Sequence, residues 1–536
     1  MVGAALSAST CWLALAGCAA VLGFEDTTLR SNVEGGAPEG GPSKDGDSTP
    51  DGGVSRLTTT PAALIVRVGK TSEITVDVAR GSDVTGPITI RLTDLPAGVT
   101  ATNASLDPVA TSGKVTLTAA PTATLGSKTI TVSAEGSSIP PAQVALLVAD
   151  APGTLDKTFN SNGLVSDLSK GLGATFYALG QQTDGKIIAG GAGGPVGGPL
   201  SGWLLRRYAT NGVPDTSFNA ATAGAPADGE LRALALDASG KIICVGSSSQ
   251  LLATAAELTV ARFLPSGAID PSFGGGGVVR FAFSEGPMGS VALGVAVQAD
   301  GSVVVVGARR DAANVEAGVI TRYKSNGTRD VAFNGGNTIV IPATRLVGAS
   351  VEANGAMFAA GSTTSGTLPS YYLARRTAQG APDPTFGIGG TVAFGNTYRA
   401  NGFARLPDGS LAVVGDVQQG AAAYTAGLAD DKGNSAFVRA YAVAPGASFY
   451  GVAAQDEKRI IAAGFTAVPK GEARVERIQT DGNRDSTFGA SGTAILEPAG
   501  GVNDVALFAA AVQGDGRILV SGNRSNTGAA VYRLWQ

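Results

Sequence analysis

The sequence predicts an all-β protein in which a β-sandwich is followed by a seven-bladed β-propeller. One phrase returns about every 50 to 60 residues from residue 155 onward, and a second phrase follows each copy. Before the first copy lies a separate run of strands in which apolar and polar residues alternate. The 77 glycines and the charged content of only 15% are typical of turn-rich β structure.

The first phrase combines an Arg, a turn Gly and an Asp that stands three residues before a Phe. A clear copy runs from Ala261 to Gly275 and contains Phe273. The other copies align at Phe159, Phe218, Phe333, Phe386 and Phe488, with a divergent copy at Phe437 midway between its neighbours. These copies give seven units that fill residues 155–536.

The second phrase ends a short apolar strand with a Gly, first within residues 184–190. The closing glycines are Gly190, Gly246, Gly307, Gly361, Gly415, Gly464 and Gly522. Apolar runs bounded by Asp-Gly, Asn-Gly and Ser-Gly turns predict four strands per unit, and seven such units predict a propeller. One strand of each unit is poor in bulk, as at residues 293–297, which suits a crowded central channel. A right-handed β-solenoid is the alternative, although solenoid repeats are usually shorter.

Arg and Asp stand eight residues apart across the turn in five copies of the first phrase. The pairs are Arg207 with Asp215, Arg262 with Asp270, Arg322 with Asp330, Arg375 with Asp383 and Arg477 with Asp485. We expect ion pairs that clamp the join between units; two separately solvated charges are the alternative. In the divergent copy Leu428 replaces the Arg and the Asp is absent too, as expected for a pair, because a lone partly buried charge is costly. Asp156 opens the series and Arg533 closes it, so closure of a ring would bring these two together.

These repeated elements resemble the delta-60 repeat of bacterial secreted proteins. The resemblance rests on the Arg-aromatic pair, the turn Gly, the Asp-x-x-Phe and the later Asp-Gly-apolar-Gly, and it covers residues 155–536. It implies no catalytic residues and no assigned function.

Residues 1–18 are predicted to form a lipoprotein signal peptide. The N-terminal segment is nearly all apolar or small, and Leu15 to Cys18 resembles a bacterial lipobox, in which the thiol of Cys18 accepts the lipid. Because no Asp follows Cys18, the resemblance favours the outer membrane. No Lys or Arg precedes the apolar run, so an uncleaved anchor and a start further upstream stay open as alternatives.

Residues 19–56 are predicted to be a disordered linker, since residues 33–56 are rich in Gly, Pro, Ser and acidic residues. Residues 57–150 form a separate domain. Its strands are expected at residues 63–68, 73–78, 88–92, 114–118, 129–133 and 144–148, and their alternation predicts a β-sandwich. Residues 95–101 resemble a turn of Ig-like modules in bacterial surface proteins, which implies a spacing or adhesive role for an Ig-like domain.

The composition excludes several classes of chemistry. A chain without His lacks Ser-His-Asp and Cys-His catalysis and the imidazole sites of most catalytic zinc and copper centres. The Gly-rich runs lack the Gly-Lys-Ser/Thr ending of a phosphate-binding loop. Cys244 lies in an apolar strand and is expected to be core filler rather than a nucleophile. The net charge of −4 argues against nucleic-acid binding, and the sequence predicts no metal and no cofactor.

The segments that vary most between units are the loops between the third and fourth predicted strands. In a propeller these loops share one face, and variable loops on a rigid scaffold commonly carry binding. Candidate aromatic side chains for stacking on a ligand are Trp203, Tyr371, Tyr372, Tyr424 and Phe465. Packing at strand ends is the alternative for each of them.

The sequence therefore predicts a monomeric, lipid-anchored cell-envelope protein whose propeller is a non-enzymatic binding or scaffold module for a protein or glycan. A structural surface protein without a specific ligand is a further alternative. A carboxylate-based glycosidase or lyase is the enzymatic alternative, and it would need two carboxylates about 5 to 10 Å apart in a pocket. Carboxylates outside the repeated positions include Glu230, Glu257, Glu285, Asp311, Glu316, Glu352, Asp416 and Asp430.

Overall fold

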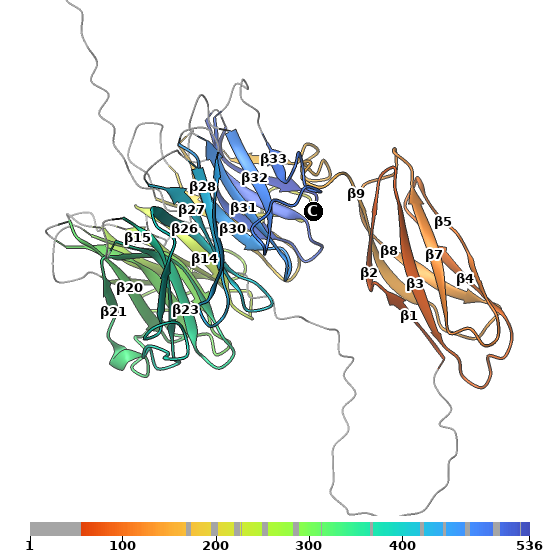
Figure 1. Cartoon of the computed structure of the whole chain (residues 1–536), viewed down its shortest axis with the longest axis horizontal. Coiled ribbons are helices and arrows are strands. Elements are labelled where there is room, and N and C mark those ends of the chain that lie inside the picture. Colours follow the sequence, from red (N-terminus) through yellow and green to blue (C-terminus); the bar gives the residue numbers. More distant parts are fainter. Residues whose placement is uncertain are drawn as a thin grey trace, which may run out of the picture. The chain divides into compact units, whose positions relative to one another are not determined.

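The computed structural model confirms the all-β class (Figure 1). It describes residues 55–167, 173–193, 202–218, 226, 228–248, 256–281, 289–311, 314–364, 368–418, 423–442, 446–466, 472–496, 504–525 and 527–536. In these ranges every regular element is a strand except one 3-10 turn, η1 (Asn334–Gly336). The described ranges contain no helix that is long and apolar enough to cross a bilayer. The predicted signal peptide, Cys18 and the linker up to residue 54 lie outside the described residues.

The described residues form two compact units. One contains residues 55–158 and Trp535 and is called the N-terminal unit here; the other contains residues 159–534 and Gln536 and is called the repeat unit. The N-terminal unit has two sheets, ordered β1-β3-β7-β5 and β2-β9-β8-β4-β6. Its strands are β1 (Arg56–Thr60), β2 (Ala63–Arg67), β3 (Thr71–Ala79), β4 (Ile88–Thr93), β5 (Val99–Ala101), β6 (Ala104–Leu106), β7 (Ser112–Ala119), β8 (Gly126–Glu135) and β9 (Ala142–Ala149).

One hydrophobic core is shared by both sheets of the N-terminal unit. Strand β3 contributes Ile74, Val76 and Val78 at alternate positions, and Ile90 and Ile130 come from the other sheet. All six expected strands are present, whereas β1, β5 and β6, with three to five residues each, were not foreseen. Arg56 begins β1, so the predicted linker boundary at residue 56 lies slightly too far along the chain.

The repeat unit contains seven antiparallel sheets among its described residues. The first three comprise β11 (Thr175–Gln181), β12 (Ile187–Ala192), β13 (Trp203–Tyr208); β14 (Glu230–Leu236), β15 (Ile242–Ser248), β16 (Glu257–Phe263), β17 (Val278–Phe281); and β18 (Ser290–Val297), β19 (Val303–Arg310), β20 (Glu316–Tyr323), β21 (Ile339–Pro342).

The next two sheets comprise β22 (Thr344–Val351), β23 (Met357–Thr363), β24 (Ser370–Arg376), β25 (Thr391–Phe394); and β26 (Tyr398–Arg405), β27 (Leu411–Val417), β28 (Ala423–Ala429), β29 (Ser435–Ala442). The last two comprise β30 (Ser448–Ala454), β31 (Arg459–Thr466), β32 (Glu472–Gln479), β33 (Thr493–Ile495); and β34 (Val505–Val512), β35 (Ile518–Arg524), β36 (Gly528–Leu534), with β10 (Leu164–Asp167) at its edge.

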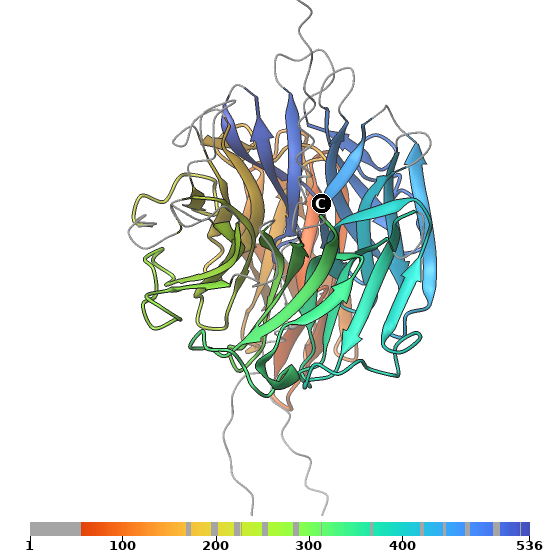
Figure 2. The same ribbon diagram turned by 90° about the vertical axis from the view of Figure 1, so that its left-hand side faces the viewer.

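The seven sheets close into a ring (Figures 1 and 2). The first strands β11, β14, β18, β22, β26, β30 and β34 each contact the next, and β34 contacts β11 again. The ring is closed by β10, which pairs antiparallel with β36 so that Leu164 lies opposite Tyr532 and Asp167 opposite Ala529. A solenoid would leave two free ends, so this alternative is wrong.

The first strands approach one another closely, which explains their small side chains. A Cβ added to Gly294 of β18 would lie 2.7 Å from the Cα of Gly348 in β22. Alanines fill the corresponding stretch of β34, where Ala509 and Ala510 are fully buried. The prediction that one strand of each unit is poor in bulk because it lines a crowded centre therefore agrees with these contacts.

Candidate functional site

Five Arg–Asp pairs of the first phrase lie at one end of the ring, which is called the turn end here. The Arg Nε lies close to an Asp Oδ2 in each: Arg207–Asp215 2.8 Å, Arg262–Asp270 2.8 Å, Arg322–Asp330 2.6 Å, Arg375–Asp383 3.3 Å and Arg477–Asp485 2.9 Å. The fourth pair is longer because Arg375 also binds Glu352 at 2.6 Å. The structure thus brings together all five Arg–Asp pairs noted in the sequence.

These five Arg–Asp pairs are called clamps here. In three of them the Arg also reaches the neighbouring sheet. Arg207 donates from Nη1 to the carbonyl of Pro265 at 2.6 Å, and Arg322 to that of Ala378 at 2.7 Å. Arg262 donates likewise to Ser325. Every acceptor stands two residues before the turn Gly of the next unit. The guanidinium lies 4.7 to 4.9 Å from the Phe ring of its own phrase at Phe218, Phe273, Phe333 and Phe488.

The turn Gly completes this junction. Gly267 and Gly380 adopt φ of +91° and +87°, in the left-handed region that favours glycine. A Cβ on Gly267 would lie 2.8 Å from the ring of Phe218, and a Cβ on Gly380 would lie 3.1 Å from Phe333. The Phe of one unit therefore packs beneath the turn of the next, so the first phrase encodes a contact between sheets.

The closing copy of the first phrase is divided between the two units, with Arg533 in the repeat unit and Asp156 in the N-terminal unit. Arg533 is 1% exposed, its guanidinium lies 4.6 Å from the centre of the Phe159 ring, and it donates to the carbonyl of Thr210. Asp156 is fully buried and accepts hydrogen bonds from the N–H and hydroxyl of Thr158, at 2.9 and 2.6 Å, as Asp215 does from Ser217. The pairing of Arg533 with Asp156 stays a prediction.

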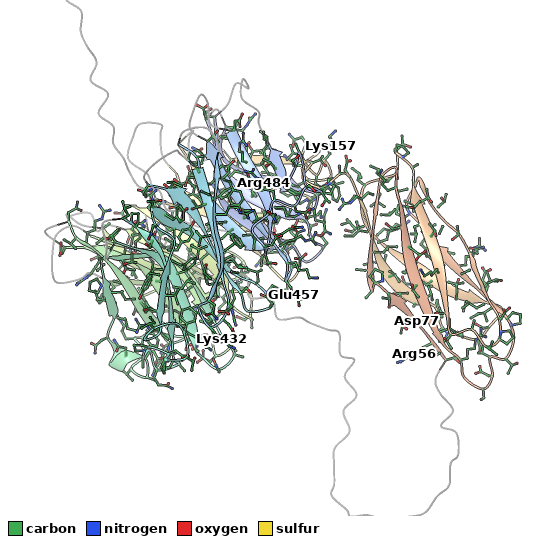
Figure 3. The ribbon with its side chains drawn as sticks, viewed as in Figure 1. Arg56, Asp77, Lys157, Lys432, Glu457 and Arg484 are labelled. Carbon is green, nitrogen blue, oxygen red and sulfur yellow. The ribbon has the colours of Figure 1, made fainter. Side chains whose placement is uncertain are left out.

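The divergent unit lacks the Arg–Asp pair and joins the next unit through different side chains. Leu428, which stands where Arg was expected, is buried in the core. Arg439 and Tyr441 of β29 instead donate to the carbonyl of Gly482 in the next unit, each at 2.9 Å. A further pair, Arg484 with the fully buried Glu476 at 2.6 Å, adjoins this junction, since the Arg484 guanidinium lies 5.1 Å from the centre of the Tyr441 ring. Figure 3 labels Arg484 on the ribbon. These substitutes lie outside the repeated positions, so repeat alignment could not find them.

The opposite end of the ring, called the bulge end here, has a β-bulge in each first strand at the same position. The bulged residues are Tyr177, Arg232, Leu293, Val347, Asn401, Tyr450 and Phe508. The second strand of each sheet ends at the bulge end and the third strand begins there. The variable loops between these two strands, counted in the sequence as the third and fourth of each unit, lie largely outside the described residues.

The closing Gly of the second phrase makes room for these bulges. A Cβ on Gly246, Gly307, Gly361, Gly415, Gly464 or Gly522 would lie 1.7 to 2.0 Å from a carbonyl oxygen of the bulged strand. In the first sheet the equivalent residue is Gly191, at 1.9 Å from the carbonyl of Thr175, rather than the Gly190 aligned in the sequence. The second phrase is thus the sequence signal of the bulges, which direct one side chain per sheet out of the regular alternation.

The bulged residues divide the bulge end into an aromatic and a polar part. Tyr177, Tyr450 and Phe508 pack together with Phe465; the ring centres of Tyr177 and Phe508 lie 5.2 Å apart, as do those of Tyr450 and Phe508. Arg232 covers the Tyr177 ring at 4.4 Å. Burial raises the pKa of the Tyr177 hydroxyl, so this residue is a neutral packing group.

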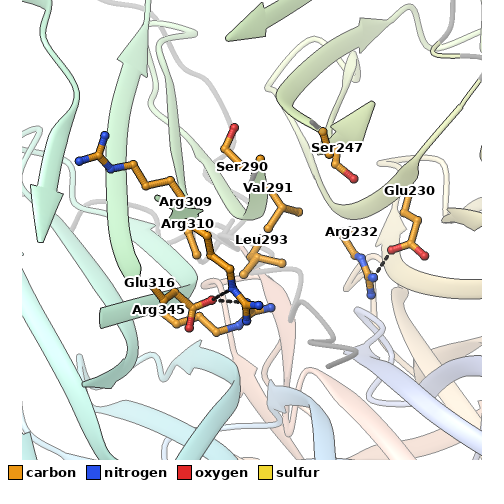
Figure 4. A pocket seen from close by; sticks show the side chains of 13 residues that line it. Glu230, Arg232, Ser247, Ser290, Val291, Leu293, Arg309, Arg310, Glu316 and Arg345 are labelled. Carbon is orange, nitrogen blue, oxygen red and sulfur yellow. Dashed lines mark hydrogen bonds and ion pairs between the residues drawn. The ribbon is translucent and has the colours of Figure 1, made fainter. Parts of the chain in front are cut away.

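A pocket of about 330 Å³ opens beside the polar part of the bulge end. Its charged lining comes from three neighbouring sheets: Glu230, Arg232, Arg309, Arg310, Glu316 and Arg345. Glu316 pairs with Arg310 at 3.7 Å and with Arg345 at 2.9 Å, and Glu230 pairs with Arg232. Figure 4 draws these side chains and marks the pairs with dashed lines. The walls also include the bulged residue Leu293 and the side chains of Val291, Ser247 and Ser290.

A second charged group lies nearby on β26 and β27. Arg399 stands two residues before its bulge, as Arg345 does in β22, and it lies 3.4 Å from Asp416. Burial raises the pKa of the Asp416 carboxyl, although Arg399 and the amides of Asn401 and Gln418 oppose this effect. Asn401, itself a bulged residue, donates to Asp416 at 2.9 Å.

The five candidate stacking aromatics lie in strands rather than at the tips of loops. Trp203, Tyr371, Tyr372 and Tyr424 are at most 9% exposed, and Trp203 donates from its indole to Ser247 at 2.9 Å. Phe465 is partly buried against Tyr450. Their placement favours packing, the alternative interpretation of these residues.

The unrepeated carboxylates are mostly engaged with arginine. Glu230 and Glu316 line the same pocket, and Glu352 binds Arg375 and Arg405 at 2.6 and 2.9 Å. Glu285 lies outside the described residues. Cys244 is fully buried, and this burial raises the pKa of its thiol, so its environment is that of core filler. Among the described residues no three His, Cys, Asp or Glu side chains are grouped as metal ligands.

Comparison with protein families gives one match. Residues 182–218, 238–273 and 298–333 match a family described as a domain of unknown function (DUF5122) beta-propeller. Each range begins near the turn between the first two strands of a sheet and ends at the Phe of the first phrase. The chain contains a β-propeller. No curated protein matches the chain.

The solved structures that match are distant. A mutant of Synechocystis apocarotenoid oxygenase is 11% identical over 84% of this chain and 94% of that one, with a TM-score of 0.34. Endo-1,5-alpha-L-arabinanase from Thermotoga petrophila RKU-1 is 8% identical over 67% and 97%, with a TM-score of 0.27. Domains 4 and 5 of the S-layer protein SbsC are 19% identical over 17% of this chain and half of that one, with a TM-score of 0.14. These likenesses are too weak to carry an argument about function.

Proposed function

We propose that the chain is a cell-envelope binding module: a seven-bladed, delta-60-like propeller that follows an Ig-like spacer and holds a ligand at its bulge end. The seven sheets and the strand β10 that closes their ring support the blade count. The two sheets around one core support the sandwich. The lipobox-like segment at Cys18 supports a lipid anchor, with the outer membrane as the expected location.

One observation carries the choice of the bulge end. There unrepeated side chains of three neighbouring sheets line one pocket, and two of them, Arg232 and Leu293, are bulged residues, whereas the turn end repeats the same junction. Pockets that bind small ligands are concave and combine apolar walls with a few placed polar groups, as this one does. The pairing of Glu230 and Glu316 with arginines favours binding over the carboxylate-based glycosidase or lyase alternative.

The test is capture of envelope components by the purified mature chain. Glycans and proteins from an envelope fraction should be retained, and a variant with Leu293→Trp, which fills the pocket wall, should retain them at least about tenfold less. Equal retention by both proteins would contradict a ligand site at the bulge end. For the anchor, Cys18→Ser should abolish incorporation of labelled fatty acid, and undiminished labelling would contradict lipidation.

A further inference from the structure

We propose that the pocket beside β14, β18 and β22 binds the carboxylate of an acidic sugar. This inference rests on the proposed binding function and deepens it by assigning a ligand class. It follows from the charge balance, the geometry and the walls of the pocket.

The charge of the pocket favours an anion. Three arginines whose ionic partners also line it, Arg232, Arg310 and Arg345, stand against the two carboxylates of Glu230 and Glu316. This group has one more positive than negative charge, on a chain whose net charge is −4. The excess is therefore local to this pocket, and it would attract an anion against the average field of the protein.

The geometry favours a carboxylate held by a shared arginine. The Arg345 and Glu316 side chains are only 15% and 28% exposed, and their ion pair at 2.9 Å fixes the Arg345 guanidinium at the pocket wall. A planar guanidinium has five donors in a rigid fork, so one that binds Glu316 still has geometry to bind a second carboxylate. Arg310, with a side chain 44% exposed, lies 3.7 Å from the same oxygen, Oε1 of Glu316, so two guanidinium groups meet at this carboxylate (Figure 4).

The other walls favour a sugar body. Val291, Leu293, Ala256 and Ala308 supply apolar surface, and Ser247 and Ser290 supply hydroxyls. A hexuronate has a carboxylate, several hydroxyls and apolar C–H faces, which match these three kinds of wall. A volume of about 330 Å³ is at the small end of the range for ligand pockets, which suits one or two sugar residues rather than a peptide helix or strand.

The test measures binding of glucuronate, glucose and inorganic phosphate by calorimetry to the full chain and to two variants. The pocket variant is Glu316→Gln with Arg345→Gln, which removes both charges of the buried pair. Arg310 also loses its partner Glu316, but its side chain is 44% exposed and stays in contact with solvent. The matched control is Lys324→Gln, which removes an exposed positive charge at the turn end of the same sheet. Thermal unfolding midpoints of all three proteins establish that each is folded.

The expected result is that glucuronate binds more tightly than glucose and phosphate. The pocket variant should weaken it about tenfold or more, and Lys324→Gln should change it less than about twofold. Glucose bound as well as glucuronate, or affinity unchanged in the pocket variant, would overturn this inference. Tighter binding of phosphate would overturn the carboxylate assignment. If none of the three binds but envelope components are still captured, the sugar-acid inference fails while the proposed binding function stands.

Discussion

The turn end and the bulge end of the ring are built on the same seven sheets, yet only one of them repeats its chemistry. At the turn end the same Arg–Asp pair recurs five times, and three of these arginines make the same hydrogen bond to a neighbouring sheet. At the bulge end the backbone repeats, but the bulged side chains range from Phe508 to Arg232. The repeated side chains at the turn end hold the ring together. The side chains that differ between sheets at the bulge end are the ones that could recognise a specific ligand.

The largest loss of folding stability should follow from breaking one Arg–Asp pair at the turn end. Arg322→Leu leaves Asp330, which is 6% exposed, without its partner at 2.6 Å, and such a loss costs about 3 to 5 kcal/mol. The double variant Arg322→Leu with Asp330→Asn imitates the divergent unit and should lose less than the sum of the single changes. Urea unfolding of the single and double variants measures this coupling; strict additivity would mean that the two charges are independent.

A smaller effect should come from closing the space behind a bulge. Gly307→Ala would place a Cβ 2.0 Å from the carbonyl oxygen of Val291, so the bulge at Leu293 must shift, at about 1 to 3 kcal/mol. Gly514→Ala is the control, because its Cβ would meet nothing within 4 Å. Gly307→Ala should also weaken the binding of any ligand in the pocket. Unchanged stability and binding would show that the closing Gly is not needed for the bulge.

Acid should weaken the turn end through its aspartates. Burial opposes ionisation of Asp270, but hydrogen bonds from Ser272 and Lys241 and the charge of Arg262 outweigh it and lower the pKa to about 2. Because the folded pKa lies below the usual value near 4, the stabilisation is present above about pH 4 and is lost as the pH falls towards 2. Over this pH range the free energy of unfolding of the unchanged chain should therefore approach that of the double variant Arg262→Leu/Asp270→Asn. A constant difference would contradict the role of this carboxylate.

The smallest loss of folding stability should follow from a change in the divergent unit, where Arg439 and Tyr441 take the place of the Arg–Asp pair. Arg439→Gln removes a hydrogen bond of 2.9 Å to Gly482, while Tyr441 still donates to the same carbonyl, so about 1 kcal/mol is expected. A loss as large as that of Arg322→Leu would mean that the divergent unit uses a clamp as strong as the ion pairs. Chemical unfolding of both variants under the same conditions compares them directly.

The sequence predicted the repeated parts of the fold and much less of the candidate site. Arg322 and Asp330 stand at a fixed spacing in a local turn, so their proximity could be inferred without any distant contact. Glu230, Glu316 and Arg345 belong to three sheets, and only closure of the ring brings them to one pocket. The closing glycines were visible as a pattern, but the carbonyl that requires them lies on another strand.

Hydrogen exchange of the full chain with and without glucuronate tests the contrast between the two ends most directly. The expected result is slower exchange at the bulge-end parts of β14, β18, β19 and β22, with no change in the turns at residues 264–267 and 324–327. Protection of those turns, or no protection at the bulge end, would contradict the division of the ring into a repeated scaffold and an unrepeated binding end.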